Sequence, residues 1–538
     1  MIGPELIVYA GQWIGLTESG QIAGTAATAD QALRVSRASR PKERVRIYWV
    51  SPDAPHVLVP AWPVEQIRSI VQPRSIWIVG GTARDLLLNR TPHDWDFAVE
   101  DDALGASRLV ADRLGGAFYA LDAERGTGRV ILSARQGTPS TILDFASLRG
   151  DGSIEGDLAA RDFTINAMAL TLNGQLVDPL CGLVDLQQGL LRETNDQVFP
   201  QDPVRLLRAV RLANILGYSI ACSTESMIPA HAERLQTVAP ERIRSELQKM
   251  LAHPSASQSL SDLNRLGLLP YTLPELAPNQ RVSSTTGESN LARVRGILAA
   301  LAELYAALQN PRGAAVSSSS RSGQVTRLMC RYQSGLMNYL AQQESSENSR
   351  AELVKWSGLF TGSASTADRE TGLSNAKASR LLVSRRLESL RFATRAIEYI
   401  ATCVEAQQAL HATTLVPVNA RFAHRYYRAF GDAGTGALLL VAATAIADAN
   451  HNSGDPEWRR TLTQIGRLLH AYFTLHDTVI APPPLLDGRD LLTLGIAEGP
   501  MVGDLLKQMR EEQAAATITT REAAIAWVRE RLKDAEQT

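Results

Sequence analysis

The spacing of apolar residues changes once along this 538-residue chain, and that change limits the possible folds more than any other feature. Up to about residue 150, short runs typical of strands alternate with helical stretches, as in SIWIV at 75–79, TARDLLLN at 82–89 and TILDFAS at 141–147. From Asp157 onward, apolar residues recur at i, i+3, i+4 and i+7, which is typical of amphipathic helices. The pattern predicts an α+β protein with its strands gathered in the N-terminal part.

A chain of this length exceeds the size of a single hydrophobic core, so several domains are expected. The predicted order is a small α/β unit of unknown role, an α/β head with a small mixed sheet, a helical neck, a helical body, a longer helical domain and a compact helical C-terminal unit. Their ranges are 1–60, 61–150, 151–225, 226–290, 291–480 and 481–538.

Local patterns refine this outline. Near the N-terminus, ELIVYAGQWIGL at 5–16 and RVRIYWV at 44–50 have strand character, and ATADQALRVSRAS between them has helical spacing. Three Ser-rich stretches later in the chain are expected to be loops, because their polar, small residues offer no apolar face to pack. They lie at 281–290, 312–323 and 361–376.

Composition excludes several classes of protein. No apolar stretch approaches the roughly 20 residues needed to span a bilayer, and no secretory signal is recognisable, so a cytoplasmic location is expected. The four cysteines are far apart, which predicts neither a zinc site nor disulfides. The net charge of −1 lacks the basic bias of a nucleic-acid binder, so any contact with RNA must come from local clusters.

Three carboxylates form the candidate catalytic group. Asp94 and Asp96 lie two apart on a predicted strand, so both side chains project from the same face and can hold the same metal ions. Asp144 lies on a later predicted strand, which can pair in the same sheet and bring a third acid to the site. Mg²⁺ held by such a group would neutralise triphosphate charge in phosphoryl transfer.

A candidate phosphate site precedes these acids. Gly80 and Gly81 stand where a predicted strand runs into a predicted helix, so backbone N–H groups and the helix dipole can approach a phosphate. Arg84 follows one turn later with a planar fork suited to triphosphate oxygens, and Asp85 can orient it.

Seven motifs in order resemble the class II tRNA nucleotidyltransferase and bacterial poly(A) polymerase family, a branch of the DNA polymerase β superfamily. The first two, VGGTARDLLL and HDWDFAV, contain the residues discussed above. The others are LDFASLR, ARDFTINAMAL, LVDPLCGLVDLQQGLLR, FPQDPVRLLRAVRLANILGY and PERIRSELQKML, so the resemblance covers residues 76 to about 251. It implies a nucleotidyltransferase head followed by helical neck, body and tail domains.

The resemblance also implies roles for individual positions. Asp94 and Asp96 match aspartates that bind the catalytic metals, and Asp144 matches an acid that helps to activate the RNA 3′-hydroxyl. The positions implied to form the nucleotide pocket are Gly80, Gly81, Arg84, Asp85, Arg161, Asp162 and Asn166. The family usually has a second arginine where this chain has Ala160, so one phosphate or RNA contact is expected to be absent.

The segment QDPVRLLRAVR at 201–211 resembles the family's protein template, in which an Asp and an Arg hydrogen-bond the Watson–Crick edge of the incoming base. Three residues apart on a predicted helix, the two side chains would share a face. The family commonly has Glu where this chain has Gln201. The implied base-recognition residues are Asp202 and Arg205, with Arg208 and Arg211 continuing the basic stripe.

The C-terminal half resembles an HD phosphohydrolase domain at RRLESLRF (385–392) and at 426–448, but the metal ligands of such a domain are missing. The His-Asp dipeptide of this C-terminal region, His476-Asp477, comes near the end of the region. A degenerate HD-like helical domain without a metal is therefore predicted.

The expected activity is addition of CMP and AMP to the 3′ end of tRNA, with ATP and CTP as substrates and Mg²⁺ as cofactor. CC-only, A-only or poly(A) addition on the same fold remain alternatives, and the segment 122–140 is expected to help discriminate between them. A catalytically silent RNA-binding protein is an alternative from another class, and an HD phosphohydrolase is the least favoured. The sequence does not indicate the oligomeric state.

Overall fold

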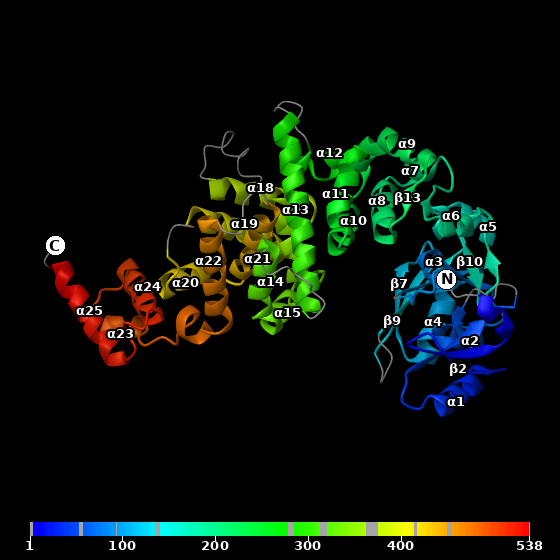
Figure 1. Ribbon diagram of the computed structural model, residues 1–538, viewed down its shortest axis with the longest axis horizontal. Helices are drawn as coiled ribbons and strands as arrows, with labels where there is room; N and C mark the ends of the chain where they lie inside the picture. The colour runs from blue at the N-terminus through cyan, green and yellow to red at the C-terminus, as the bar shows by residue number, and fades with distance from the viewer. Residues whose placement is uncertain are drawn as a thin grey trace. The chain divides into compact units, whose positions relative to one another are not determined.

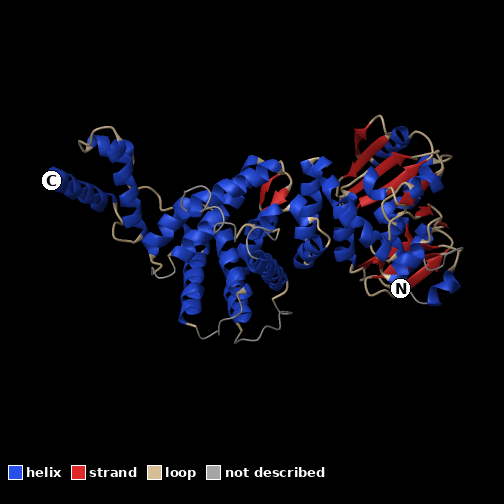
Figure 2. Cartoon of the chain, turned by 90° about the horizontal axis from the view of Figure 1, so that it is seen from above, coloured by secondary structure: helices blue, strands red, loops and turns tan. Residues whose placement is uncertain are grey.

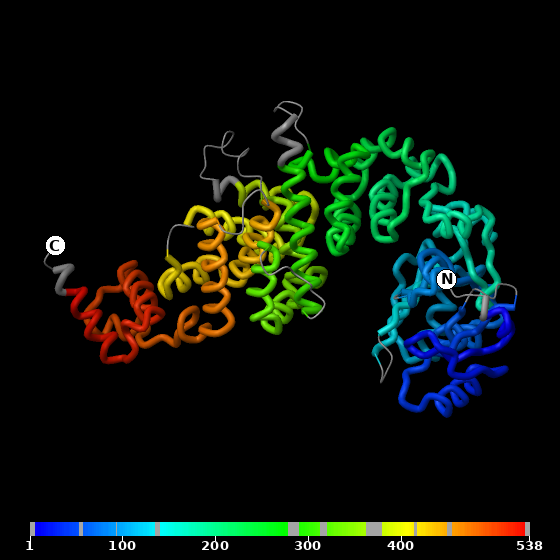
Figure 3. The backbone as a smooth tube through the Cα atoms, in the orientation of Figure 1, coloured from blue at the N-terminus to red at the C-terminus, as the bar shows by residue number. Residues whose placement is uncertain are grey.

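A computed structural model describes residues 4–52, 58–92, 94–134, 140–277, 284–311, 320–361, 375–413, 417–448 and 455–536. The chain packs as two compact units, Met1–Arg234 and Leu235–Thr538. Strands and helices alternate in the first unit, whereas the second is built almost entirely from helices (Figure 2). The path of the backbone can be followed by colour in Figure 3. The α+β class predicted from the sequence is confirmed.

The N-terminal segment forms a four-stranded antiparallel sheet in the order β2-β1-β3-β4. Its strands are β1 (Trp13–Thr17), β2 (Ile22–Ala26), β3 (Val45–Val50) and β4 (Leu58–Pro60). The sheet is attached to the head, because the Trp49 indole N–H donates to the Asn173 carbonyl at 3.2 Å, and Arg68 donates to the Asn173 side chain at 2.8 Å.

One strand expectation in this segment is wrong. ELIVY lies in the 3₁₀ helix η1 (Pro4–Tyr9) and not in a strand. Pro4 favours this conformation because its fixed φ suits a first helical turn. Leu6 is buried, while Ile7 and Val8 are both exposed, so the segment does not alternate as a half-buried strand would.

The head contains a seven-stranded mixed sheet in the order β11-β10-β5-β6-β9-β8-β7. Strands β6 and β9 are parallel, and the other neighbours pair antiparallel. The strands are β5 (Ile76–Val79), β6 (Asp94–Val99), β7 (Ala117–Asp122), β8 (Thr127–Leu132), β9 (Thr141–Ser147), β10 (Ala169–Thr171) and β11 (Leu176–Val177).

This sheet extends beyond residue 150, where the sequence suggested that the head ends. Strand β10 pairs with β5, so a segment assigned to the helical neck completes the sheet. Short strands β12 (Leu190–Leu191) and β13 (Ser219–Ile220) also occur after Asp157, where only helices were expected. Strands of two or three residues are too short to show an alternating pattern. Part of the segment 122–140 forms the β7–β8 hairpin, and residues 135–139 lie outside the described residues.

The head sheet has two different faces. Trp95, Phe97, Leu143 and Phe145 project into a large apolar core, where the Phe97 and Phe145 rings stack at 5.0 Å. Because successive side chains alternate, the residues between them project from the opposite face. Ala98 on that face packs in a smaller cluster with residues of α5.

Helices connect and cover the strands of the first unit (Figure 1). Helix α4 packs on the side of the large core, and the neck helices follow the sheet in the chain. After η1, the helices from the N-terminal sheet to the end of the neck are α1 (Ala29–Ser39), α2 (Ala61–Val71), α3 (Gly80–Leu87), α4 (Ala103–Leu114), α5 (Ile154–Ala159), η2 (Thr164–Asn166), α6 (Gly182–Gln188), α7 (Val198–Gln201), α8 (Arg205–Leu216), α9 (Cys222–His231) and η3 (Ala232–Thr237).

The second unit is helical apart from the short pair β14 (Gln343–Ser345) and β15 (Asn348–Ser349). Its helices up to residue 412 are α10 (Pro240–Ala252), α11 (Ala256–Arg265), α12 (Leu269–Thr272), η4 (Pro274–Leu276), α13 (Ser284–Gln309), α14 (Arg321–Cys330), α15 (Gln333–Ala341), α16 (Arg350–Leu359), α18 (Asn375–Ser389) and α19 (Thr394–Ala412). The others are α20 (Ala420–Phe430), α21 (Ala433–Ala447), α22 (Pro456–Phe473), the π-helix η5 (His476–Ile480), α23 (Gly488–Thr493), α24 (Pro500–Ala514) and α25 (Arg521–Glu536).

The Ser-rich stretches were expected to be loops throughout, and the structure corrects their edges. Helices α13, α14 and α18 begin inside them, at Ser284, Arg321 and Asn375. Residues 281–283, 312–319 and 362–374 lie outside the described residues. In the described part of the chain, no single helix is long and apolar enough to cross a membrane, although α20 and α21 together pass that test across a 107° bend.

Candidate active site

The three predicted carboxylates share one face of the head sheet. Asp96 on β6 is the direct register partner of Asp144 on the parallel strand β9, and Asp94 lies two residues before Asp96. All three project away from the large apolar core, because the residues between them fill it. The register therefore places Asp96 and Asp144 side by side, as two adjacent strands require.

Helix α3 fixes the strand that carries the first two acids. The Thr82 hydroxyl donates to the Asp94 carbonyl at 3.1 Å and accepts from the Asp96 backbone N–H at 2.9 Å. Thr82 is buried, so water does not compete for these hydrogen bonds. One side chain thus links the glycine turn to the β6 backbone from which the carboxylates project.

The surroundings of Asp96 disfavour the ionised form of its carboxyl. Burial raises its pKa to about 6, the charges of Asp144 and Asp94 add to that increase, and Arg161 and Arg129 oppose it. Like charges and low solvent access both disfavour the ionised carboxyl, and a bound cation would relieve both. This arrangement is typical of functional sites.

Arg129 holds the third acid. Its Nε and Nη2 donate to Asp144 Oδ1 and Oδ2 at 2.7 Å and 2.8 Å, from the directly opposite position on β8. Among the described residues, no three His, Cys, Asp or Glu side chains converge so as to hold a metal ion. The Arg129 fork explains this at Asp144, because it engages both carboxylate oxygens.

The residues nevertheless fit Mg²⁺ in kind and in backbone position. Carboxylate oxygens are the ligands that Mg²⁺ prefers, and all three are offered by one sheet face. Burial first, and then the charges of Asp144 and Asp94, raise the pKa of Asp96, so a cation bound there would favour its ionised form. One side-chain rearrangement, release of Asp144 by Arg129, would free the third ligand.

The glycine turn lies against the carboxylates. Gly80 has a φ of +66°, and a Cβ there would lie 3.0 Å from Arg161 Nη1 and 3.5 Å from Asp96 Oδ2. Glycine is therefore required for its conformation and for the space it leaves. Arg161 is itself anchored, since its Nη2 donates to Asp157 Oδ2 at 2.7 Å.

A chain of hydrogen bonds joins the predicted nucleotide-binding residues. Arg84 donates to Asp85 Oδ1 at 2.8 Å and to Asn166 Oδ1 at 2.7 Å. Asn166 donates in turn to Asp162 Oδ1 at 3.1 Å. Arg208 Nη1 donates to Asp162 Oδ2 at 2.9 Å. Residues from α3, η2 and α8 thus meet in one polar network.

Asp162 is buried at the centre of this network. Burial acts to raise its pKa, but Arg208 and the hydrogen bonds from Asn166 and the Phe163 N–H outweigh burial and hold the pKa below its usual value. A buried carboxylate held ionised in this way fixes the donors that surround it.

The structure corrects the prediction that Asp202 and Arg205 share a helix. Asp202 is extended and follows α7, whereas Arg205 begins α8. The two side chains still meet, with Arg205 Nε 3.9 Å from Asp202 Oδ2. Arg205 also donates to the Ala160 carbonyl at 3.1 Å, which connects it to the segment bearing Arg161. Arg211 lies on α8 one turn beyond Arg208.

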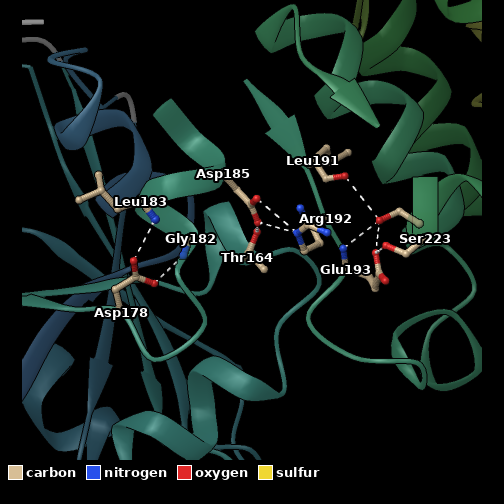
Figure 4. Close-up of polar contacts among 10 residues, drawn as sticks. Thr164, Asp178, Gly182, Leu183, Asp185, Leu191, Arg192, Glu193 and Ser223 are labelled. Carbon is tan, nitrogen blue, oxygen red and sulfur yellow. Dashed lines mark hydrogen bonds and ion pairs between the residues drawn. The ribbon is translucent and has the colours of Figure 1, made fainter. Parts of the chain in front are cut away.

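Polar contacts within the neck hold the turn η2 in place (Figure 4). Asp178 accepts from the backbone N–H groups of Gly182 and Leu183 at 2.7 Å and 2.9 Å, which caps the start of α6. On the same helix, Asp185 accepts from the Thr164 hydroxyl at 2.7 Å and from Arg192 Nε at 3.1 Å. Thr164 opens the turn η2, so these contacts hold the turn that presents Asn166 to Arg84.

Three residues of the site were not predicted from the sequence. Thr82 lies within VGGTARDLLL, and Asp157 lies three residues before ARDFTINAMAL, but tertiary packing sets the hydrogen-bond partners of both. Arg129 lies in the segment that was considered only as a loop. No sequence signal marks Arg129, because its place opposite Asp144 depends on the register of β8 against β9.

A mixed sheet that carries three aspartates on one face, beside a glycine turn and Arg161, is the arrangement that the motifs led us to expect of a nucleotidyltransferase head. Residues 76–192 match the family described as the poly A polymerase head domain, and residues 217–280 match the probable RNA and SrmB-binding site of polymerase A. The A-adding tRNA nucleotidyltransferase of Deinococcus radiodurans is 30% identical over 468 residues, which is 84% of this chain and 94% of that enzyme. The chain therefore belongs to the tRNA nucleotidyltransferase and poly(A) polymerase family, as its motifs predicted.

Two further similarities complete the comparison. The CC-adding tRNA nucleotidyltransferase of Geobacter sulfurreducens is 46% identical over 181 residues, which is 34% of this chain and 41% of that enzyme. The crystal structure of the Bacillus stearothermophilus CCA-adding enzyme in complex with CTP is 20% identical, with a TM-score of 0.57, and the match covers 88% of this chain and 97% of that chain. This last similarity shows the fold.

Proposed function

We propose that the chain adds CMP and AMP from CTP and ATP to the 3′ end of tRNA, completing the CCA sequence with release of pyrophosphate. The observation that carries this proposal is the register of Asp96 opposite Asp144, with Gly80 and Arg161 beside them. Asp94, Asp96 and Asp144 would hold Mg²⁺, which when bound neutralises charge on the triphosphate.

The reaction forms a bond between the RNA 3′-oxygen and the α-phosphorus of the nucleotide and breaks the bond to pyrophosphate. Backbone N–H groups at the start of α3, together with Arg84 and Arg161, bind and orient the triphosphate. Asp144 accepts a hydrogen bond from the 3′-hydroxyl and takes its proton as the bond forms. The buried network around Asp162 keeps these groups in place.

Base choice is assigned to Asp202 and Arg205. A carboxylate accepts from the exocyclic amine of C or A, and a guanidinium donates to the ring acceptors, whereas U and G present the wrong groups. Gln201 is neutral, so it attracts Arg205 less strongly than the family's glutamate would.

Partial addition, of CC alone or of A alone, is the second candidate, because enzymes of both kinds are among the relatives of this chain. Relatives that match along more than four fifths of the chain include an A-adding and a CC-adding enzyme, and a CC-adding enzyme is 46% identical over 181 residues. On the proposed site, a CC-adding enzyme would stop before the final A, and an A-adding enzyme would begin only on RNA that already ends in CC.

One experiment tests these proposals. Purified full-length protein is incubated with CTP and ATP together, only one of them labelled, and one of three RNAs: tRNA lacking CCA, tRNA ending in CC, and an unstructured RNA. CCA addition predicts labelling of the first by both nucleotides and of the second by ATP alone. CTP incorporation without subsequent AMP indicates a CC-adding enzyme, and activity on the second RNA alone indicates an A-adding enzyme. No labelling of any RNA would leave the silent RNA-binding alternative.

A further inference from the structure

The second unit contains a cavity that the proposed function does not use. It has a volume of about 780 Å³ and is lined by residues of α14, α20, α22 and the segment around the π-helix η5. Ligand pockets in proteins typically measure roughly 300–1,000 Å³, so the space suits a molecule of nucleotide size.

Basic side chains enter the cavity from two helices. Arg327 lies on α14 and Arg331, four residues later, is the residue that caps this helix, while Arg467 and His470 are three apart on α22, so each pair lies on one side of its helix. None of the described residues that line the cavity is Asp or Glu. The chain as a whole has a net charge of −1, so this basic lining is a local departure.

Two of these side chains, Arg331 and Arg467, have N–H groups available to a ligand. Arg467 donates one N–H to the Val418 carbonyl at 2.8 Å, which fixes its guanidinium and leaves other N–H groups. Arg331 is exposed, and no carboxylate of the described chain pairs with either arginine. Two guanidinium groups without acidic partners favour an anion with several oxygens, such as a phosphate chain.

The rest of the lining is apolar. Leu328 comes from α14, and Leu475 and Val479 come from the segment of η5. Leu475 is 36% exposed, so part of its side chain is accessible in the cavity that the arginines also line. A π-helix is rare and is often found at functional sites. Such a surface suits the flat face of a base.

We propose that this cavity binds a nucleotide, with its phosphates on Arg331 and Arg467 and its base on the apolar surface formed by Leu328, Leu475 and Val479. The lining favours a ligand that has both a phosphate part and a base. An inorganic anion would leave the apolar surface uncovered, and an uncharged apolar molecule would leave the two arginines without an anion. The same chemistry is offered by a free nucleotide and by one unit of an RNA strand, and the experiment separates them.

The test counts nucleotide sites on the full-length protein. Equilibrium dialysis with labelled ATP, in EDTA to prevent turnover, is expected to show two sites per wild-type chain, one in the head and one in the cavity. Arg331→Gln/Arg467→Gln is expected to keep the head site and weaken the other at least ten-fold. The control is Arg459→Gln/Arg460→Gln, which changes two exposed arginines of the same helix α22 that do not line the cavity, and it should retain both sites.

Three other probes define the ligand at the cavity site. Adenosine and pyrophosphate are each expected to compete with ATP at least ten-fold more weakly than ATP itself, because each lacks one half of the ligand. An oligoadenylate of four nucleotides that competes more tightly than ATP would identify an RNA strand as the source, and one that competes more weakly would identify a free nucleotide. Two full-strength ATP sites in Arg331→Gln/Arg467→Gln, or pyrophosphate binding as tight as that of ATP, would overturn the proposal.

Discussion

The Asp96 carboxyl lies between Asp94 and Asp144, at a place where burial already disfavours its ionised form. Its pKa is about 6 in the folded protein against 3.8 for an unperturbed group, so the folded state binds more protons than the unfolded state between these values. Stability conferred by this group is therefore lost as the pH rises through that window. Above pH 6, the ionised Asp96 destabilises the metal-free head.

We expect Asp96→Asn to abolish nucleotide addition and yet to raise the stability of the metal-free protein by about 1–3 kcal/mol at pH 7.5, because a shift of one pKa unit corresponds to about 1.4 kcal/mol. The gain should disappear near pH 4. Urea denaturation at both pH values measures it, with Asp101→Asn, an exposed acid just after the same strand, as the control. Loss of stability at pH 7.5 would show that Asp96 has a structural role instead.

Arg129 supplies positive charge to the acids by binding Asp144 through both oxygens. Because a metal ion needs the same oxygens, we expect Arg129→Met to bind Mn²⁺ several-fold more tightly than the wild type in the absence of nucleotide, as measured by electron paramagnetic resonance. Without the ion, the variant should be less stable, since the carboxylates then lose one of the two arginines whose charge offsets theirs.

Arg125→Met provides the matched control, because Arg125 lies in the turn between β7 and β8, is 85% exposed and pairs with Asp122. It should leave Mn²⁺ affinity unchanged. Arg129→Lys should fall between the wild type and Arg129→Met, because lysine keeps the charge and loses the fork. Weaker Mn²⁺ binding by Arg129→Met would mean that Arg129 orients Asp144 for the ion and does not compete with it.

At the scale of elements, the junction between α7 and α8 positions Asp202 and Arg205, the pair proposed to recognise the base. We expect Asp202→Ala to accept UTP or GTP while it retains triphosphate binding, because the mismatch that rejects these bases costs roughly 1–3 kcal/mol per unpaired group. Single-nucleotide incorporation with each of the four NTPs on one tRNA measures this. An equal loss of rate for all four, with C and A still preferred, would place base choice elsewhere.

Helices α10 and α16 are joined by a buried lysine. Lys355 on α16 donates to the Leu251 and Ala252 carbonyls at 2.8 Å each, at the C-terminal end of α10. Burial lowers the pKa of Lys355 to about 8 from 10.5. The unfolded chain therefore binds more protons between pH 8 and 10.5, and the stability that depends on Lys355 rises with pH across this window.

We expect Lys355→Met to destabilise the second unit by about 1–3 kcal/mol at pH 7, because two helix-end carbonyls lose their partner. The difference from the wild type should grow as the pH rises from 8 to 10, since only the wild type gains stability there. Denaturation curves of both proteins across this range measure the change. A difference that shrinks with pH would show that the ammonium charge itself stabilises the contact.

The sequence predicted those elements whose signals are local. The strand, glycine turn and helix at 76–87 and the strands bearing Asp96 and Asp144 follow from alternation and from Gly80 and Gly81. Strand β10 was missed because three residues carry no period, and it forms by pairing with β5 across a long sequence separation. Asp202 was placed on a helix because a helical pattern does not mark its first residue, and helix ends are set by local caps.

Site contacts divide in the same way. The motifs supplied Arg84, Asn166 and Asp162, and the structure joins them in one network. The Arg129 pairing depends on the register of two strands, and register is fixed by the buried face of the whole sheet. Sequence spacing alone cannot supply it.

At the scale of the molecule, each of the two units has a core of its own. The first is built on the head sheet, and the second surrounds α21, where Leu438, Leu439 and Leu440 are fully buried. Units with separate cores can unfold in separate transitions, and a ligand raises only the transition of the unit that binds it.

Differential scanning calorimetry is therefore expected to resolve two transitions, with Lys355→Met lowering only that of the second unit. Mg²⁺-ATP at about 100 times its dissociation constant adds about 2.7 kcal/mol to a binding unit, or about 5–10 °C for a unit of this size. It should raise both transitions of the wild type if the cavity binds nucleotide, and only that of the first unit in Arg331→Gln/Arg467→Gln. A single transition that moves as a whole with every variant and ligand would show that the two cores unfold as one cooperative structure, and the chemistry of the head would then be coupled to the stability of the helical unit.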